Sequence, residues 1–231
     1  MKFENTTVFN FDGALRGMRN PLESWHKNDS YWDWENTPPQ TFPKYVIGEN
    51  DKQLAQKLIR AGSTHRKFMR QIFICVDITA PLYFFKEFDT YKVGTVGNST
   101  STMHKLASTP ITLDCFEIDD YDELEDEYID DVNNHKAKVE GFINWLEYLR
   151  GRYNQTKSKK IWKEIVRWLA SGWLQKRTIT MNYETVLSMI DQRKHHKLNE
   201  WSGIDDDTLD NFIKWARTLP YANELLFIDE E

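Results

Sequence analysis

The sequence predicts a single α+β domain that spans residues 1–231. Residues 71–79 form a short run rich in β-branched and aromatic side chains, and residues 173–180 alternate in the manner of a strand. Elsewhere apolar residues recur at helical spacing, for example Val139, Phe142, Ile143 and Leu146. No internal repeat or low-complexity linker divides the chain. Strands and helices mixed in this way along one chain are typical of an α+β domain.

The remaining segments follow the same local rules. Helices are predicted over residues 50–62, 82–89, 129–153, 161–169, 183–192 and 207–219. About the first 45 residues are punctuated by glycine and proline and carry three tryptophans, which indicates an irregular segment wrapped over the core. Residues 94–102 are polar and contain two glycines, so we expect a loop there.

Composition excludes several classes of protein. The 231 residues are 40% hydrophobic and 29% charged, and 14% are aromatic, which does not fit a disordered chain, a collagen-like fibre or a coiled coil. Mean hydropathy is −0.67, and no apolar run approaches the roughly 20 residues that cross a bilayer. Residues 1–5 carry charge without the apolar stretch of a secretory signal. We therefore expect a cytoplasmic protein that has no membrane partner.

Charge is distributed unevenly around the net value of −6. Residues 117–131 hold ten carboxylates and no lysine or arginine. Residues 150–177 hold nine lysines and arginines against one glutamate, Glu164. Such a basic stretch could attract a small anionic ligand, pair with the acidic segment or form a solvated face. Duplex nucleic acid is not an expected partner, because neither a basic domain nor a groove-reading element is present.

Most standard catalytic and metal-binding signatures are absent. The sequence contains no P-loop, no GxGxxG after a strand, no HExxH and no GxSxG. Its six histidines show no ligand spacing. Cys75 and Cys115 are too few and too far apart for a disulfide scaffold or a CxxC site. We expect no metal site and two reduced cysteines.

One C-terminal pattern is more specific. Asn182 follows a predicted strand and begins a predicted helix, Arg193 comes eleven positions later, and Glu200-Trp201 follows. This order resembles that of the flavin-dependent thymidylate synthases, the ThyX family. The resemblance extends from about residue 10 to residue 205 and is most specific at this C-terminal element.

Upstream segments occur in the order of the same family. His65 falls at the first histidine of the family's His-Glu-Ser/Thr-Pro-Phe-Glu-His element, and a strand, an Ala-Pro turn and a helix follow. Thr90-Tyr91-Lys92 then stands where the family has Arg-His-Arg. Ser99 and Ser101 fall in the family's Ser-x-Asn-x-x-Ser-x-Arg region if one residue is inserted. The signature itself has therefore changed, and lysine does not reproduce the planar fork of arginine.

The resemblance implies a fold and an activity. The fold would be a mixed or antiparallel sheet packed with long helices. The activity would be reductive methylation of deoxyuridylate, with FAD as the hydride donor, methylenetetrahydrofolate as the carbon donor and NADPH as the reductant. The nucleotide would contact Arg193, Lys92, Ser99, Ser101 and Tyr91. The flavin would lie near Asn182, His65 and Thr90. Each site would form between subunits of a homotetramer.

Other interpretations stay open for the same residues. Arg193 could pair with a carboxylate at a helix end, Tyr91 could belong to the core or its rim, His65 could cap a helix, and Ser99 and Ser101 could be ordinary loop residues. For the whole protein, one alternative is a non-catalytic binder that sequesters a nucleotide or a nucleotide signal, of the kind a phage encodes. Another is an interaction protein that uses the Trp-rich first 45 residues and the acidic segment.

Overall fold

The computed structural model describes residues 1–118, 135–203 and 210–229. The chain folds into two compact units. Unit 1 comprises Met1–Lys2, Ile78–Thr90 and Asn98–Arg177, and unit 2 comprises Phe3–Asp77, Tyr91–Gly97 and Thr178–Glu231. Helices and an antiparallel sheet occur together in the chain, which confirms the α+β class. The extent of the single domain stays a prediction.

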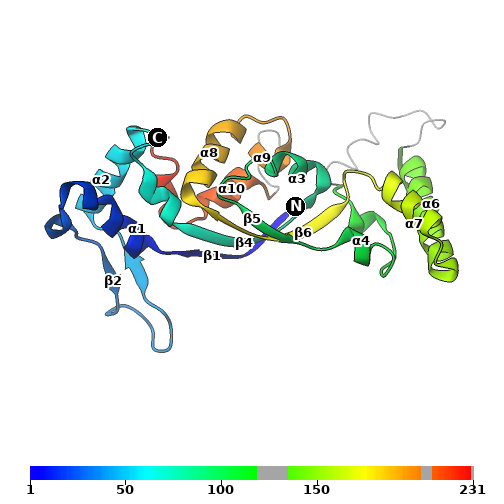
Figure 1. Ribbon diagram of the computed structural model, residues 1–231, viewed down its shortest axis with the longest axis horizontal. Helices are drawn as coiled ribbons and strands as arrows, with labels where there is room; N and C mark the ends of the chain where they lie inside the picture. The colour runs from blue at the N-terminus through cyan, green and yellow to red at the C-terminus, as the bar shows by residue number, and fades with distance from the viewer. Residues whose placement is uncertain (119–134, 204–209, 230–231) are drawn as a thin grey trace. The chain divides into compact units, whose positions relative to one another are not determined.

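The main sheet has four strands in the order β1-β4-β6-β5 (Figure 1). They are β1 (Lys2–Phe9), β4 (Phe73–Pro81), β6 (Leu174–Asn182) and β5 (Val96–Ser99). The strands predicted over residues 71–79 and 173–180 are confirmed as β4 and β6, each displaced by one or two residues. In β4 the side chains of Ile74, Val76 and Ile78 are fully buried and alternate with more exposed ones. This strand therefore has one buried face.

The first 45 residues are more regular than the sequence predicted. They contain β1, the helix α1 (Phe11–Met18) and the strands β2 (Tyr31–Asp33) and β3 (Lys44–Val46), which pair as an antiparallel hairpin. The buried residues of α1 recur at helical spacing: Phe11, Ala14, Leu15 and Met18. The irregular segment was thus a wrong prediction. Gly13 and Gly17 suggested breaks, but the apolar stripe stabilises a helix through its packing.

Unit 2 contains further helices. Among them are α2 (Glu49–Arg60), the 3₁₀ helix η3 (Lys67–Gln71), α8 (Tyr183–Arg193), α9 (Asn199–Ser202), α10 (Phe212–Arg217) and α11 (Ala222–Leu225). The predicted helices over residues 50–62 and 183–192 are confirmed as α2 and α8. The one predicted over 207–219 is confirmed only as the shorter α10, and residues 207–209 lie outside the described part of the chain. Asn211 sets the start of α10, because its side chain accepts a hydrogen bond from the N–H of Lys214 at 2.8 Å.

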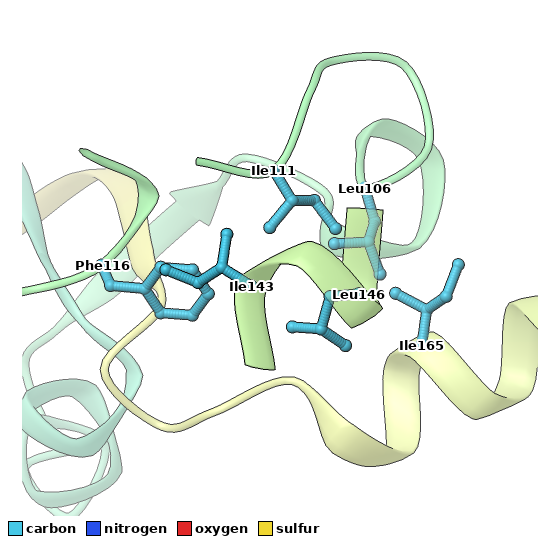
Figure 2. Packing of buried hydrophobic residues seen from close by; sticks show 6 residues of the cluster. All are labelled: Leu106, Ile111, Phe116, Ile143, Leu146 and Ile165. Carbon is cyan, nitrogen blue, oxygen red and sulfur yellow. The ribbon is translucent and has the colours of Figure 1, made fainter. Parts of the chain in front are cut away.

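The helices predicted over residues 82–89, 129–153 and 161–169 are confirmed in unit 1 as α3 (Leu82–Phe88), α6 (His135–Thr156) and α7 (Lys159–Trp168). The short helix α4 (Thr102–Lys105), which was not predicted, also belongs to this unit. Figure 2 shows the buried cluster of this unit, in which side chains from α6, α7 and the segment before them face one another. Its members are Leu106, Ile111, Phe116, Ile143, Leu146 and Ile165. Residues 129–134 of the predicted long helix lie outside the described residues.

Two polar segments of the sequence remain. The loop predicted over residues 94–102 instead contains β5 and the start of α4, because its polar residues pair with β6 and cap a helix. Of the acidic segment 117–131, the structure describes only Glu117 and Ile118. The Glu117 carboxylate pairs with the terminal amino group of Met1 at 2.8 Å. Among the described residues, no helix has both the length and the apolar character that a membrane span requires.

Candidate functional site

Helix α8 positions the two ends of the C-terminal pattern. β6 ends at Asn182, whose Oδ1 accepts hydrogen bonds from the N–H of Thr185 at 2.9 Å and from its hydroxyl at 3.1 Å. Asn182 is therefore the N-cap of α8, and Arg193 lies in the last turn of the helix. The 11 residues of α8 span about 16 Å, so Asn182 and Arg193 stand at opposite ends.

The Arg193 guanidinium is held by side chains on several sides. Its Nε donates a hydrogen bond to the hydroxyl of Tyr91 at 2.9 Å. Its Cζ lies 5.6 Å from the centre of the Tyr91 ring and 5.0 Å from that of Trp201. Trp201 is fully buried, and its ring centre lies 6.3 Å from that of Tyr91. A positive charge next to the faces of aromatic rings is stabilised by their quadrupoles.

A short strap, residues 91–95, runs along α8 from one end to the other. Tyr91 contacts the last turn of the helix, whereas Gly94 lies over its first turn. A Cβ on Gly94 would stand 2.7 Å from the Thr185 hydroxyl and 2.9 Å from Asn182 Nδ2. Gly94 also has φ +89°, a conformation that favours glycine. The strap therefore approaches α8 closely because this position has no side chain.

The remaining predicted nucleotide contacts have local structural roles or are exposed. Ser101 Oγ accepts a hydrogen bond from the N–H of His104 at 3.2 Å and so caps α4. Ser99 is exposed at the end of β5, and Lys92 is exposed on the strap. Ser99 and Ser101 belong to unit 1, whereas Arg193 and Tyr91 belong to unit 2. Within unit 2, the structure brings Tyr91 to Arg193.

The side chains of Thr90 and Tyr91, in the tripeptide Thr90-Tyr91-Lys92, make hydrogen bonds within the chain. The Thr90 hydroxyl donates to the carbonyl oxygen of Glu87 at 2.7 Å, next to the end of α3. The Tyr91 hydroxyl donates to Gln192 Oε1 at 3.0 Å and accepts from Arg193. Of the three side chains, Lys92 is the one cation, and it presents a point charge. The tripeptide therefore offers one cation and two hydroxyls in place of the two guanidiniums and the imidazole of Arg-His-Arg.

His65 lies on a separate cavity in unit 2. The cavity has a volume of about 510 Å³ and is bordered by α1, α2 and η3. Leu54, Leu58 and Phe68 give it apolar walls, and Lys67 places a cation there. The next residue after His65, Arg66, pairs through Nε with Glu184 in the first turn of α8 at 2.8 Å. Glu184 and Arg193 are nine positions apart, which is about 13 Å along the helix. The chain thus places His65 and Asn182 toward one end of α8 and Arg193 at the other.

The sequence did not reveal every residue around Arg193 or the cavity beside His65. The hydrophobic spacing of Leu54 and Leu58 identified a helix but gave no sign of a cavity. Gln192 and Gly94 were visible only as an ordinary polar residue and a loop glycine. In the part of the chain that the structure describes, no three His, Cys, Asp or Glu side chains gather in a way that could hold a metal ion.

Comparison with known proteins finds no match to the sequence but does find matches to the fold. No family model and no curated protein matches the sequence. Two crystal structures of thymidylate synthase X (ThyX) from Helicobacter pylori, both with FAD and dUMP, match nearly the whole chain. The chain has a ThyX-like fold.

The measures of this match are consistent between the two structures. One has a TM-score of 0.62 at 15% identity and covers 99% of this chain and 98% of that one. The other has a TM-score of 0.63 at 16% identity, with 99% of each chain covered. At such identity the match to ThyX shows the fold, and the ligands are those of the H. pylori protein.

Proposed function

We propose that this chain binds a pyrimidine nucleotide, with dUMP as the candidate, and that Arg193 is the central contact. The ThyX-like fold over the full chain supports the class of ligand. The observation that carries the proposal is the Arg193 guanidinium, fixed at the end of α8 against the rings of Tyr91 and Trp201.

The chemistry of this arrangement suits an anionic or carbonyl-rich ligand. Arginine presents a planar fork of N–H donors that matches a phosphate or the edge of a base. A guanidinium that is already oriented loses less side-chain freedom when a ligand binds. A nucleotide offers both a phosphate and a pyrimidine edge, and the exposed Lys92, next to Tyr91 in the chain, adds a positive charge.

Two versions of this function differ in catalysis. In the first, the protein is a divergent flavin-dependent synthase that methylates dUMP with FAD, methylenetetrahydrofolate and NADPH. In the second, it binds the nucleotide without catalysis, as a sequestering protein would. Two observations favour the second version. The hydroxyls of Thr90 and Tyr91 already donate hydrogen bonds within the chain. The tripeptide also lacks the two guanidiniums of Arg-His-Arg.

Calorimetry with dUMP tests the binding site. We expect micromolar or tighter binding to the wild-type protein. Arg193→Ala should weaken it by about 10- to 100-fold, the range for losing hydrogen bonds from a charged group. The matched control is Lys194→Ala, which removes the same charge from the adjacent, exposed position and should change affinity by less than about threefold. Absence of nucleotide binding to the wild type, or equal losses in the two variants, would contradict the proposal.

Flavin separates the two versions. A yellow purified protein that releases tritium from dUMP labelled at the pyrimidine would support catalysis. Colourless protein whose melting temperature does not rise with added FAD, but does rise with dUMP, would support the non-catalytic binder.

A further inference from the structure

The Tyr91 hydroxyl has a fixed hydrogen-bonding direction. A phenol has one proton to donate, and the Tyr91 hydroxyl gives it to Gln192 Oε1 at 3.0 Å. Its oxygen then faces Arg193 Nε and accepts the hydrogen bond at 2.9 Å. Gln192 is itself oriented, because its Nε2 donates to the hydroxyl of Ser188 one turn earlier at 3.1 Å. The chain Ser188–Gln192–Tyr91 therefore ends on the guanidinium.

Packing against two aromatic rings also restricts the guanidinium. The fully buried Trp201 lies 5.0 Å from its Cζ, and the Tyr91 ring lies 5.6 Å from it. A buried indole has little freedom to move, so it provides a rigid surface. Tyr91 thus contacts the arginine both with its ring and with its hydroxyl.

The backbone of Tyr91 is also anchored. The hydroxyl of Thr95 donates to the Tyr91 carbonyl oxygen at 2.7 Å. Three residues after Tyr91, Gly94 lies against Asn182 and Thr185. Both ends of the strap are therefore attached to α8, which holds the Tyr91 side chain over the last turn.

From this geometry we infer that Tyr91 is the positioning residue of the nucleotide site: its hydroxyl and ring hold the Arg193 guanidinium in the orientation that receives the ligand. The inference rests on the proposed function in one respect, namely that the ligand received is a nucleotide. The holding of the guanidinium itself is a property of the unliganded chain.

Tyr91→Phe tests the inference, because it keeps the ring and removes the hydroxyl. Two measurements are made on the wild-type and variant proteins: calorimetric affinity for dUMP, and the ¹H–¹⁵N NMR signal of the Arg193 Nε–H group. The signal is assigned by its loss in Arg193→Lys. We expect the dissociation constant to rise by about three- to tenfold, as for loss of one orienting hydrogen bond. We also expect the Nε–H signal to shift and to exchange faster with water. The matched control is Tyr148→Phe, which removes a hydroxyl from an exposed tyrosine of α6 and should leave both readouts unchanged.

Each outcome decides between the two claims. If wild-type protein binds dUMP and Tyr91→Phe binds it equally well with an unchanged Nε–H signal, the positioning role is wrong and the proposed function stands. If wild-type protein binds no nucleotide, the proposed function is wrong. The NMR signal then decides the positioning claim alone: a signal altered by Tyr91→Phe supports it, and an unaltered signal overturns it.

Discussion

Single positions in unit 2 carry constraints that their residue types alone do not reveal. Gly94 is surrounded by polar sequence, yet its φ of +89° and its close approach to Thr185 and Asn182 leave no room for a side chain. Tyr45 and Tyr183 are likewise buried with their hydroxyl groups. At each of these positions, the residues packed around the side chain determine how much a substitution or an ionisation lowers the stability of the fold.

Gly94→Ala should destabilise the protein. The new Cβ would collide with the Thr185 hydroxyl at 2.7 Å, and the backbone would keep a strained positive φ. We expect the free energy of unfolding to fall by about 1–3 kcal/mol in chemical denaturation. The control is Gly141→Ala in the exposed face of α6, where a Cβ meets no atom within 4 Å. That change should be neutral or stabilising by up to about 1 kcal/mol. Equal stability of the two variants would contradict the close approach of the strap.

Buried tyrosines predict a loss of stability at alkaline pH. Burial, together with the nearby Asp12 carboxylate, raises the pKa of Tyr45 from 10.0 to about 12. Burial also raises the pKa of Tyr183, whose hydroxyl donates to the carbonyl oxygen of Pro220 at 2.6 Å. Because the unfolded chain releases these protons first, the stabilisation is complete below pH 10 and is lost as pH rises toward 12. Denaturant titrations across this range should show a falling free energy of unfolding, and Tyr45→Phe should reduce the slope. A flat profile would show that the phenols are accessible to water.

At the scale of elements, α8 links the observations. Its N-cap is Asn182, its first turn pairs with Arg66 and its last turn carries Arg193. The sequence predicted this helix well because an N-cap asparagine and an apolar period are both local signals. It failed for α1 and β5, because two glycines and a polar run are also local signals and pointed to irregular structure. There the packing of Phe11 and Leu15, and the pairing with β6, decided the outcome.

Two substitutions of Asn182 distinguish its role as a helix cap from a contact with a ligand. Asn182→Ala removes the acceptor for the Thr185 N–H and should lower the free energy of unfolding by about 0.5–2 kcal/mol. Asn182→Asp keeps an acceptor oxygen at the positive end of the helix and should retain most of the stability. Thermal and denaturant unfolding measure both. If Asn182→Asp keeps stability but loses FAD-dependent stabilisation that the wild type has, Asn182 also serves the flavin. If Asn182→Ala is as stable as the wild type, the cap contributes little.

At the scale of the whole molecule, we propose that the chain assembles as a homotetramer. Some of its exposed residues are large and apolar: Val93 is 93% exposed and Val96 is 72% exposed, both on or next to the strap that carries Tyr91. Apolar side chains exposed together at one place often mark a contact surface. Coverage by another copy would place that copy beside the strap that runs along α8.

Light scattering after size exclusion tests the assembly. We expect a mass of four times the 27.5 kDa chain, and we expect Val93→Asp to shift the protein toward smaller species by placing a charge in the contact. Lys27→Asp, a charge change at an exposed position in the first 45 residues, is the control and should leave the mass unchanged. A wild-type mass of one chain would contradict the assembly.

The sequence by itself determined the α+β class, strands β4 and β6, helices α2, α6, α7 and α8, and the two residues at the ends of α8. These depend on patterns within a few residues of one another, which fix local backbone conformation. Only the tertiary structure decided that Tyr91 meets Arg193, 102 positions away, with Trp201 behind the guanidinium. That contact depends on the strap, which passes so close to α8 that only glycine fits at position 94. The distance between two such chain segments is set by tertiary packing and not by local sequence.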